Sequence, residues 1–197
     1  MSLTLIKTNI FTKIPLSIIQ YLYDLTMNFY NDADEIIPNI YLGNHNSALN
    51  LNFLKKNDIN VIINCTKDKS FITDDVDIRP EMYRIPVNDS LLECDFIIMQ
   101  EQLKNIVPLL LRKYTIEKKN ILVHCHMGKQ RSAIVVAALL KVLLDHNYLS
   151  LDEVPKNITS KKQFSYICNY IVKKRPQSFT FGYRINFKPS YFRFFNI

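Results

Sequence analysis

Glycine is scarce in this sequence and tryptophan is absent. The 197 residues include only three glycines, Gly43, Gly128 and Gly182, so each is expected where the backbone needs the freedom that glycine gives. No internal repeat and no low-complexity tract is visible. With 48% apolar and 22% charged residues, the composition is that of an ordinary folded protein, and the length suits one domain with a sizeable core.

Metal-ligand spacing is missing as well. The four cysteines form no C-x-x-C pair and no zinc-binding pattern. His124, Cys125 and His126 are adjacent, but neighbours on a strand point to opposite faces and cannot close around one ion. We therefore expect neither a metal nor another cofactor. Because no signal peptide is seen, the free thiols favour a reducing, cytoplasmic compartment.

No segment reads as a membrane span. The apolar stretch 14–30 is broken by Pro15, Gln20, Asp24 and Asn28, so it is too short and too polar to cross a bilayer. Its apolar residues lie mostly at helical spacing, which predicts an amphipathic helix. Such a helix would pack on its own domain, form a homodimer contact or lie on a membrane surface.

Positive charge is concentrated in the second half of the chain. Residues 1–100 carry 8 Lys/Arg against 13 Asp/Glu, whereas residues 101–197 carry 17 against 5. The second half is therefore basic by 12 charges, which favours an anionic substrate or surface.

The most informative stretch runs from His124 to Ser132. An apolar strand-like run, residues 121–123, precedes it, and an apolar helix-like run, residues 133–144, follows it. A strand, a tight loop and a helix make a phosphate cradle, because the loop N–H groups converge on one point and the helix N-terminus adds its dipole. A cysteine there would be held as the nucleophilic thiolate, and Arg131 can bind two phosphate oxygens at once.

Elsewhere, strand-like apolar runs alternate with segments of helical spacing. A short strand and turn is expected at 36–43, strands at 59–64, 81–87 and 121–124, and helices at 47–56, 96–113, 133–144 and 160–174. Ser47 and Ser160 are candidate N-caps, and Pro108 is expected to kink or break its helix. The aromatic tail, residues 179–195, is expected to pack against the core, or else to bind a partner. The alternation predicts an α/β domain with a central, mostly parallel sheet flanked by helices.

The loop resembles the H-C-x-x-G-x-x-R-[ST] signature of the cysteine-dependent phosphatases. Residues 35–44, 59–66, 83–90 and 173–176 are similar, in order, to segments of the family's dual-specificity branch, so the resemblance covers roughly residues 33–178. Residues 155–163 look like an insertion. The lack of tryptophan excludes the Trp-Pro-Asp loop of the tyrosine-specific branch. The variant at residues 129–133 is similar to forms found in large DNA viruses, including poxviruses.

The resemblance implies a protein tyrosine phosphatase-like catalytic domain over residues 33–197, after a helical extension over residues 1–32. It implies hydrolysis of phosphotyrosine, and of phosphoserine or phosphothreonine, in protein substrates, within the cytoplasm of a host cell or a virion if the chain is viral. Cys125 would be the nucleophile that forms a phosphocysteine, and Arg131 would hold the phosphoryl oxygens. Ser132 would donate a hydrogen bond to the departing sulfur, and His124 would support the loop. The phosphate-binding residues would be His126, Met127, Gly128, Lys129, Gln130 and Arg131.

A general acid must come from a separate loop and reach the leaving oxygen. Asp89 matches the family's position, 36 residues before Cys125. Asp95 and Glu93 are the alternatives.

Other functions use the same loop. The basic second half and Lys129 also suit a phosphoinositide phosphatase or an RNA 5′-triphosphatase, which would make a phosphoinositide or a nucleic acid the partner. A phosphate-binding pseudophosphatase is disfavoured, because Cys125, Arg131 and Asp89 are all present.

Overall fold

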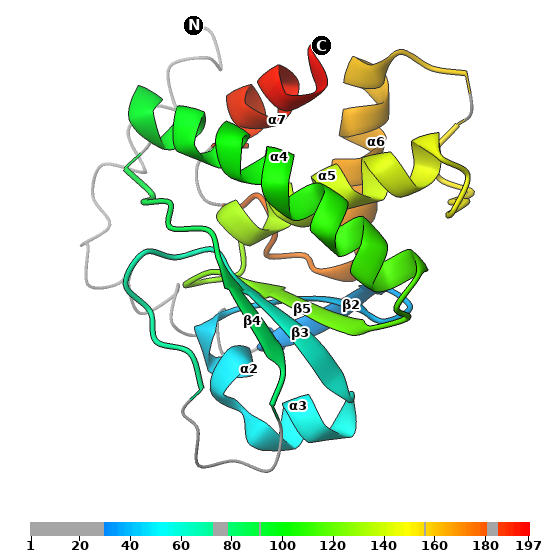
Figure 1. Ribbon diagram of the computed structural model, residues 1–197. Coiled ribbons are helices and arrows are strands. Elements are labelled where there is room, and N and C mark those ends of the chain that lie inside the picture. The colour runs from blue at the N-terminus through cyan, green and yellow to red at the C-terminus, as the bar shows by residue number, and fades with distance from the viewer. Residues whose placement is uncertain (1–29, 73–78, 91, 156, 181–184) are drawn as a thin grey trace, which may run out of the picture. The chain divides into compact units, whose positions relative to one another are not determined.

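The computed structural model describes residues 30–72, 79–90, 92–155, 157–180 and 185–197 (Figure 1). Asp32–Ile197 form one compact unit. The amphipathic helix expected at residues 14–30, and with it the predicted extension and homodimer contact, lies outside the described residues.

A five-stranded mixed sheet forms the centre of this unit, in the order β1-β2-β5-β3-β4. The strands are β1 (Ala33–Ile37), β2 (Ile40–Gly43), β3 (Ile59–Asn64), β4 (Glu81–Arg84) and β5 (Asn120–His124). Only the β1–β2 pairing is antiparallel, and the other three are parallel. The predicted α/β fold with a mostly parallel sheet is therefore confirmed. The short strand and turn expected at 36–43 is part of a hairpin: Pro38 and Asn39 (φ 69°) turn the chain between β1 and β2.

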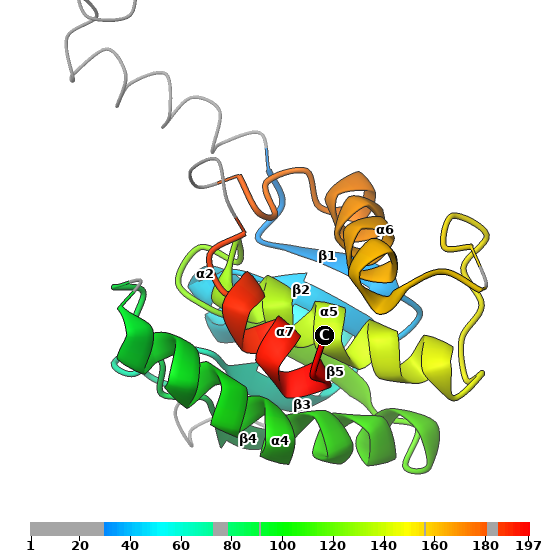
Figure 2. The same cartoon turned by 90° about the horizontal axis from the view of Figure 1, so that it is seen from above.

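Helices cover both faces of the sheet. One face carries α4 (Glu93–Thr115), α5 (Arg131–Asp145), α6 (Ser160–Lys174) and α7 (Lys188–Phe195), and the other carries the short α2 (His45–Leu49) and α3 (Leu51–Lys56) (Figures 1 and 2). Helix α5 is buried along nearly its whole length, because α4, α6 and α7 pack around it (Figure 2). This central helix begins at Arg131, so the fold places the end of the motif in the core.

The two predicted N-cap residues, Ser47 and Ser160, were wrong, although the observed caps lie within three residues of them. The helix expected at 47–56 is two helices, since Asn50 leaves helical geometry (ψ 95°) and caps the second one. Asn44, not Ser47, caps the first, and its Oδ1 accepts from the Ser47 N–H at 3.0 Å. Thr159, not Ser160, caps α6. Asn44 and Thr159 lie three residues and one residue before the predicted caps, and the side chain of each accepts from a backbone N–H in the first turn of its helix.

The sequence predicted that Pro108 would kink or break its helix, but the helix is not broken there. Helix α4 is continuous from Glu93 to Thr115 with Pro108 inside it. Pro108 and Lys104 are both exposed, so water can donate to the Lys104 carbonyl, which loses its helical partner because proline has no N–H group.

The aromatic tail packs against the core, as predicted. Phe187 and Tyr191 are fully buried, and the Tyr191 ring lies 4.4 Å from that of Phe164 on α6. The Ser190 hydroxyl donates to the Phe96 carbonyl on α4 at 2.8 Å. Among the helices that the structure describes, none is long and apolar enough to cross a membrane.

Candidate active site

The loop of residues 125–130 leaves the central strand and enters the central helix. Strand β5 lies between β2 and β3, and the Cys65 N–H donates to the His124 carbonyl at 2.7 Å where β3 and β5 end. Helix α5 starts directly after the loop, at Arg131. The predicted strand–loop–helix unit is therefore present, and the N-terminal end of α5 meets the loop.

Hydrogen-bond donors surround the Cys125 sulfur. The Gly128 N–H lies 3.2 Å from Sγ and the Ser132 Oγ lies 3.3 Å from it, while Cys125 is only 3% exposed. Burial alone would raise the pKa of this thiol, but the Arg131 charge, the Ser132 hydroxyl and N–H, and the Lys129 N–H bring the pKa below its ordinary value. The site therefore favours the thiolate, the form of cysteine that acts as a nucleophile.

Arg131 connects the loop to the segment that follows β4. Its Nη1 donates to the Val87 carbonyl at 3.0 Å, and its Nε lies 3.7 Å from Asp89 Oδ2. The Arg131 side chain is 9% exposed, whereas that of Asp89 is 42% exposed. A buried guanidinium thus faces the loop on one side and an accessible carboxylate on the other.

The three candidate acids have different surroundings. Asp95 is 1% exposed, and its Oδ2 accepts from the Ser90 hydroxyl and, at 3.1 Å, from the Ser90 N–H. Glu93 pairs with Arg193 at 2.6 Å. Only Asp89, of these three, pairs with Arg131, and Asp95 holds the loop that carries it.

His124 lies in the core behind the cysteine. It is fully buried, its Nδ1 lies 3.4 Å from the Cys125 carbonyl, and its ring stacks on that of His45 at 6.0 Å. Burial is the main cause that lowers the pKa of His124 to about 4. The His45 N–H donates to the His126 carbonyl at 3.1 Å, so α2 supports the loop as well.

The remaining loop residues differ in exposure. His126 is exposed and Met127 is half-buried, but Lys129 and Gln130 are 6% and 2% exposed. The Lys129 carbonyl accepts from the Phe179 N–H at 2.8 Å, and the Gln130 Oε1 accepts from the Asn186 N–H at 3.1 Å. We expected Lys129 to attract anions from the surface, but this residue is buried. Within the described ranges, no three His, Cys, Asp or Glu side chains are grouped to hold a metal ion.

One contact of the loop was missed from the sequence. The Arg175 Nε donates to the Gly128 carbonyl at 3.1 Å, and Arg175 is 1% exposed. Gly128 has φ 68°, a region that glycine occupies without strain. The Arg-Pro pair directly after α6 was the available signal, but the 47-residue separation of the two partners hid the contact.

Comparison with known proteins identifies the family. Residues 40–169 match the family described as "Dual specificity phosphatase, catalytic domain". The chain belongs to the dual specificity phosphatase family. Human dual specificity protein phosphatase 16 is 31% identical over 133 residues, which is 64% of this chain. The chain spans only 18% of that relative's length.

Solved structures of dual specificity phosphatases share the fold. The Yvh1 phosphatase domain from Chaetomium thermophilum has a TM-score of 0.63 at 19% identity, over 83% of this chain and 95% of that one. OH1 from the Orf virus, a tyrosine phosphatase with triple substrate specificity, has a TM-score of 0.60 at 19% identity, over 89% and 98%. The predicted phosphatase fold is confirmed, and residues 40–169 match the catalytic domain of the predicted enzyme class, the dual-specificity phosphatases.

Proposed function

We propose that this enzyme hydrolyses phosphotyrosine, and phosphoserine or phosphothreonine, in proteins through a phosphocysteine intermediate. One observation carries the proposal: the Cys125 sulfur is buried within hydrogen-bond distance of the Gly128 N–H and the Ser132 hydroxyl, beside the Arg131 guanidinium. Donors around a sulfur stabilise a thiolate, and the same donors can hold phosphoryl oxygens.

In the first step, the Cys125 thiolate attacks phosphorus. A sulfur–phosphorus bond forms while the bond from phosphorus to the ester oxygen breaks. Arg131 and the loop N–H groups bind the non-bridging oxygens, whose charge is redistributed in the transition state. Asp89 donates its proton to the leaving oxygen. A phosphoryl group bound to Arg131 would replace the 3.7 Å contact with Asp89 and release that carboxyl for proton transfer.

In the second step, water attacks the phosphocysteine. Asp89, now a carboxylate, takes a proton from the water, and the phosphorus–sulfur bond breaks to release inorganic phosphate. The Ser132 hydroxyl, 3.3 Å from Sγ, donates a hydrogen bond to the thiolate as it leaves. Stabilising this leaving group speeds the step, since a hydrogen bond to the charged sulfur is stronger than one to a neutral atom.

The test is phosphate release from matched phosphotyrosine and phosphothreonine peptides, with Cys125→Ser as the control. Release that disappears in Cys125→Ser is the expected result, and the ratio of the two rates gives the preference. No release from either peptide, by protein shown to be folded and reduced, would overturn the proposal.

The same loop suits a second class of substrate. The excess of 17 Lys/Arg over 5 Asp/Glu in residues 101–197 favours a phosphoinositide or an RNA 5′-triphosphate, whereas the burial of Lys129 weakens that alternative. Release from either compound, with both peptides untouched, would establish it. Tight peptide binding without turnover would instead indicate a pseudophosphatase.

The setting of the enzyme is also part of the proposal. The variant at residues 129–133 supports an origin in a large DNA virus, and a thiolate nucleophile needs a reducing compartment such as the cytoplasm. The helical pattern of residues 14–30 supports homodimerisation. An unchanged monomer mass by light scattering, in the full chain and in a chain that starts at residue 32, would exclude the dimer.

A further inference from the structure

Arg175 is the largest side chain that the described unit buries completely. It follows α6 as its C-cap residue, where its N–H donates to the Ile171 carbonyl, and it is 1% exposed. Burying a guanidinium is unfavourable unless its N–H groups and its charge are satisfied. The contacts that satisfy Arg175 therefore show what this side chain holds in place.

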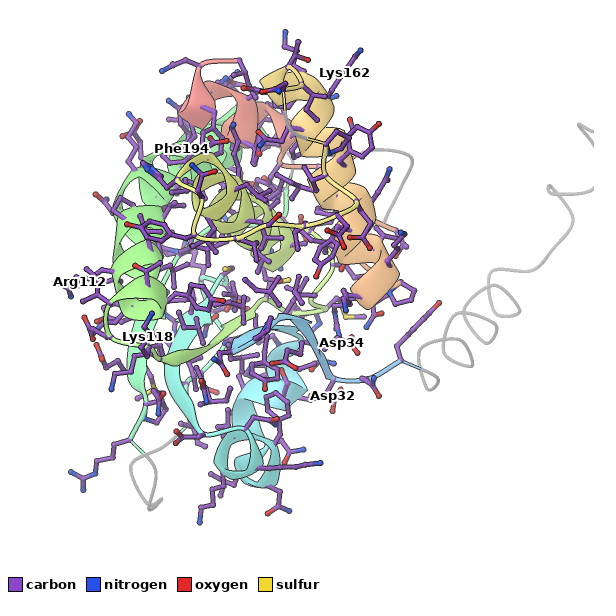
Figure 3. The ribbon with its side chains drawn as sticks, turned by 90° about the vertical axis from the view of Figure 1, so that its right-hand side faces the viewer. Asp32, Asp34, Arg112, Lys118, Lys162 and Phe194 are labelled. Atoms are coloured by element: carbon purple, nitrogen blue, oxygen red, sulfur yellow. The ribbon has the colours of Figure 1, made fainter. Side chains whose placement is uncertain are left out.

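Those contacts join three separate parts of the fold. Nη1 donates to Asp34 Oδ2 on β1 at 2.6 Å, Nη2 lies 3.4 Å from the Asp32 carbonyl, and Nε donates to the Gly128 carbonyl at 3.1 Å. Figure 3 shows Asp34 on β1 close to the end of α6. The guanidinium thus anchors the catalytic loop to the edge of the sheet.

The contact with Gly128 also fixes the next N–H group. The Gly128 carbonyl and the Lys129 N–H belong to one planar trans peptide unit, so they point in opposite directions. Arg175 holds the carbonyl on the outer side of the loop, and the Lys129 N–H is consequently turned inward. That N–H is one of the donors that lower the pKa of the Cys125 thiol.

The charges of Arg175 and Cys125 also interact. Burial lowers the pKa of Arg175, and Asp34 together with the Cys125 charge acts in the opposite direction. The Asp34 side chain is 15% exposed, so this ion pair is well shielded from water and its geometry is restricted.

We propose that Arg175, held by Asp34, is a positioning residue for phosphate hydrolysis: it orients the Gly128–Lys129 peptide unit so that the Lys129 N–H faces the Cys125 sulfur and the phosphoryl oxygens. The inference rests on the proposed function, because it assigns the orientation of that same loop. Arg175 touches neither the sulfur nor the substrate in this account, and it acts through the peptide unit alone.

The test compares Arg175→Met, Arg175→Lys and Asp34→Asn with the wild type. The pKa of the Cys125 thiol is measured from the pH dependence of its alkylation by iodoacetamide, and tungstate affinity reports phosphate-like binding without turnover. In Arg175→Met we expect the thiol pKa to rise by about one unit, since a hydrogen bond to a charged group is worth roughly that much. Tungstate affinity and kcat/KM should each fall about tenfold. Asp34→Asn and Arg175→Lys should give smaller shifts in the same direction.

Lys113→Met is the matched control. The Lys113 side chain is 7% exposed and pairs with Glu81 at 2.7 Å and Glu117 at 2.8 Å, away from the loop. This variant also loses a buried cation, so its Tm should fall, whereas the thiol pKa and the tungstate affinity should stay unchanged.

An unchanged thiol pKa and tungstate affinity in folded Arg175→Met would overturn the inference, and so would an equal shift in Lys113→Met. If Arg175→Met does not fold, Arg175→Lys and Asp34→Asn decide by the same criteria. Both readouts work without turnover. Shifted values in a protein that releases no phosphate would therefore support the loop assignment while refuting the proposed function.

Discussion

A single added methyl group at Gly128 is expected to impair both folding and catalysis. In Gly128→Ala the new Cβ would lie 2.5 Å from the Gly43 carbonyl oxygen and 2.7 Å from Arg175 Nη2. A carbon–oxygen contact normally needs about 3.3 Å, so the deficit is about 0.8 Å. Gly43 is paired with both Ala33 and His124 in the sheet, so its carbonyl cannot retreat and the catalytic loop must move instead.

The expected size of the effect follows from this geometry. A left-handed conformation costs an L-residue about 1–2 kcal/mol, and overpacking costs about 1–3 kcal/mol more. The reduced entropy of the unfolded chain offsets about 0.4–1 kcal/mol. The net loss of about 2–4 kcal/mol corresponds to a Tm lowered by about 5–15 °C for a domain of this size. A loop shift of about 1 Å would lower kcat/KM about a hundredfold.

Asn39→Ala is the control that separates backbone strain from steric clash. Asn39 has φ 69°, close to the 68° of Gly128, but it lies exposed in the β1–β2 turn. This variant should lose about 1 kcal/mol of stability and keep full activity. Thermal unfolding and the hydrolysis of p-nitrophenyl phosphate measure both effects. If Gly128→Ala kept its Tm within about 2 °C and its kcat/KM within about twofold, Gly128 would not be sterically required in the loop.

Three further variants test separate groups of the site. Ser132→Ala should raise the pKa of the Cys125 thiol by about 1–2 units, the value of one charge-assisted hydrogen bond, and an unchanged alkylation profile would contradict this. Asp89→Asn should lower kcat on a phosphotyrosine peptide by about 10²–10⁴-fold but much less on p-nitrophenyl phosphate, whose leaving group needs no proton; equal losses on both would argue against the acid role. For His124, the folded pKa of about 4 lies below the ordinary 6.5, so the native state binds fewer protons between these values and stability falls as the pH drops. The loss should be about 2 kcal/mol near pH 5 relative to neutral pH, and urea unfolding of His124→Gln should show a much smaller dependence.

The parts of the site that depend on neighbouring residues could be predicted from the sequence. The strand, loop and helix around Cys125 follow one another directly, so their types and order determine where the sulfur meets the donors. Ser132, seven residues after Cys125, was expected near the sulfur and lies 3.3 Å from it. The mostly apolar run Ile59–Asn64 was likewise predicted with its observed bounds, because a strand buried on both faces has a distinctive composition.

Contacts between distant segments could not be predicted in this way. The Arg175 contact depends on how α6 ends against β1 and the loop, and no local pattern encodes that arrangement. Pro108 was judged from its missing N–H group alone, whereas its position on the solvent side of α4 decides the outcome. The burial of Lys129 could not be predicted either, because the segment at Phe179 that contacts Lys129 lies 50 residues later in the sequence.

The most direct test of the central claim is mass spectrometry of the enzyme after acid quenching during turnover of a phosphotyrosine peptide. We expect one phosphoryl group on Cys125, with more phosphoenzyme trapped in Ser132→Ala and none in Cys125→Ser. Turnover without a phosphorylated Cys125, or activity that persists in Cys125→Ser, would contradict it.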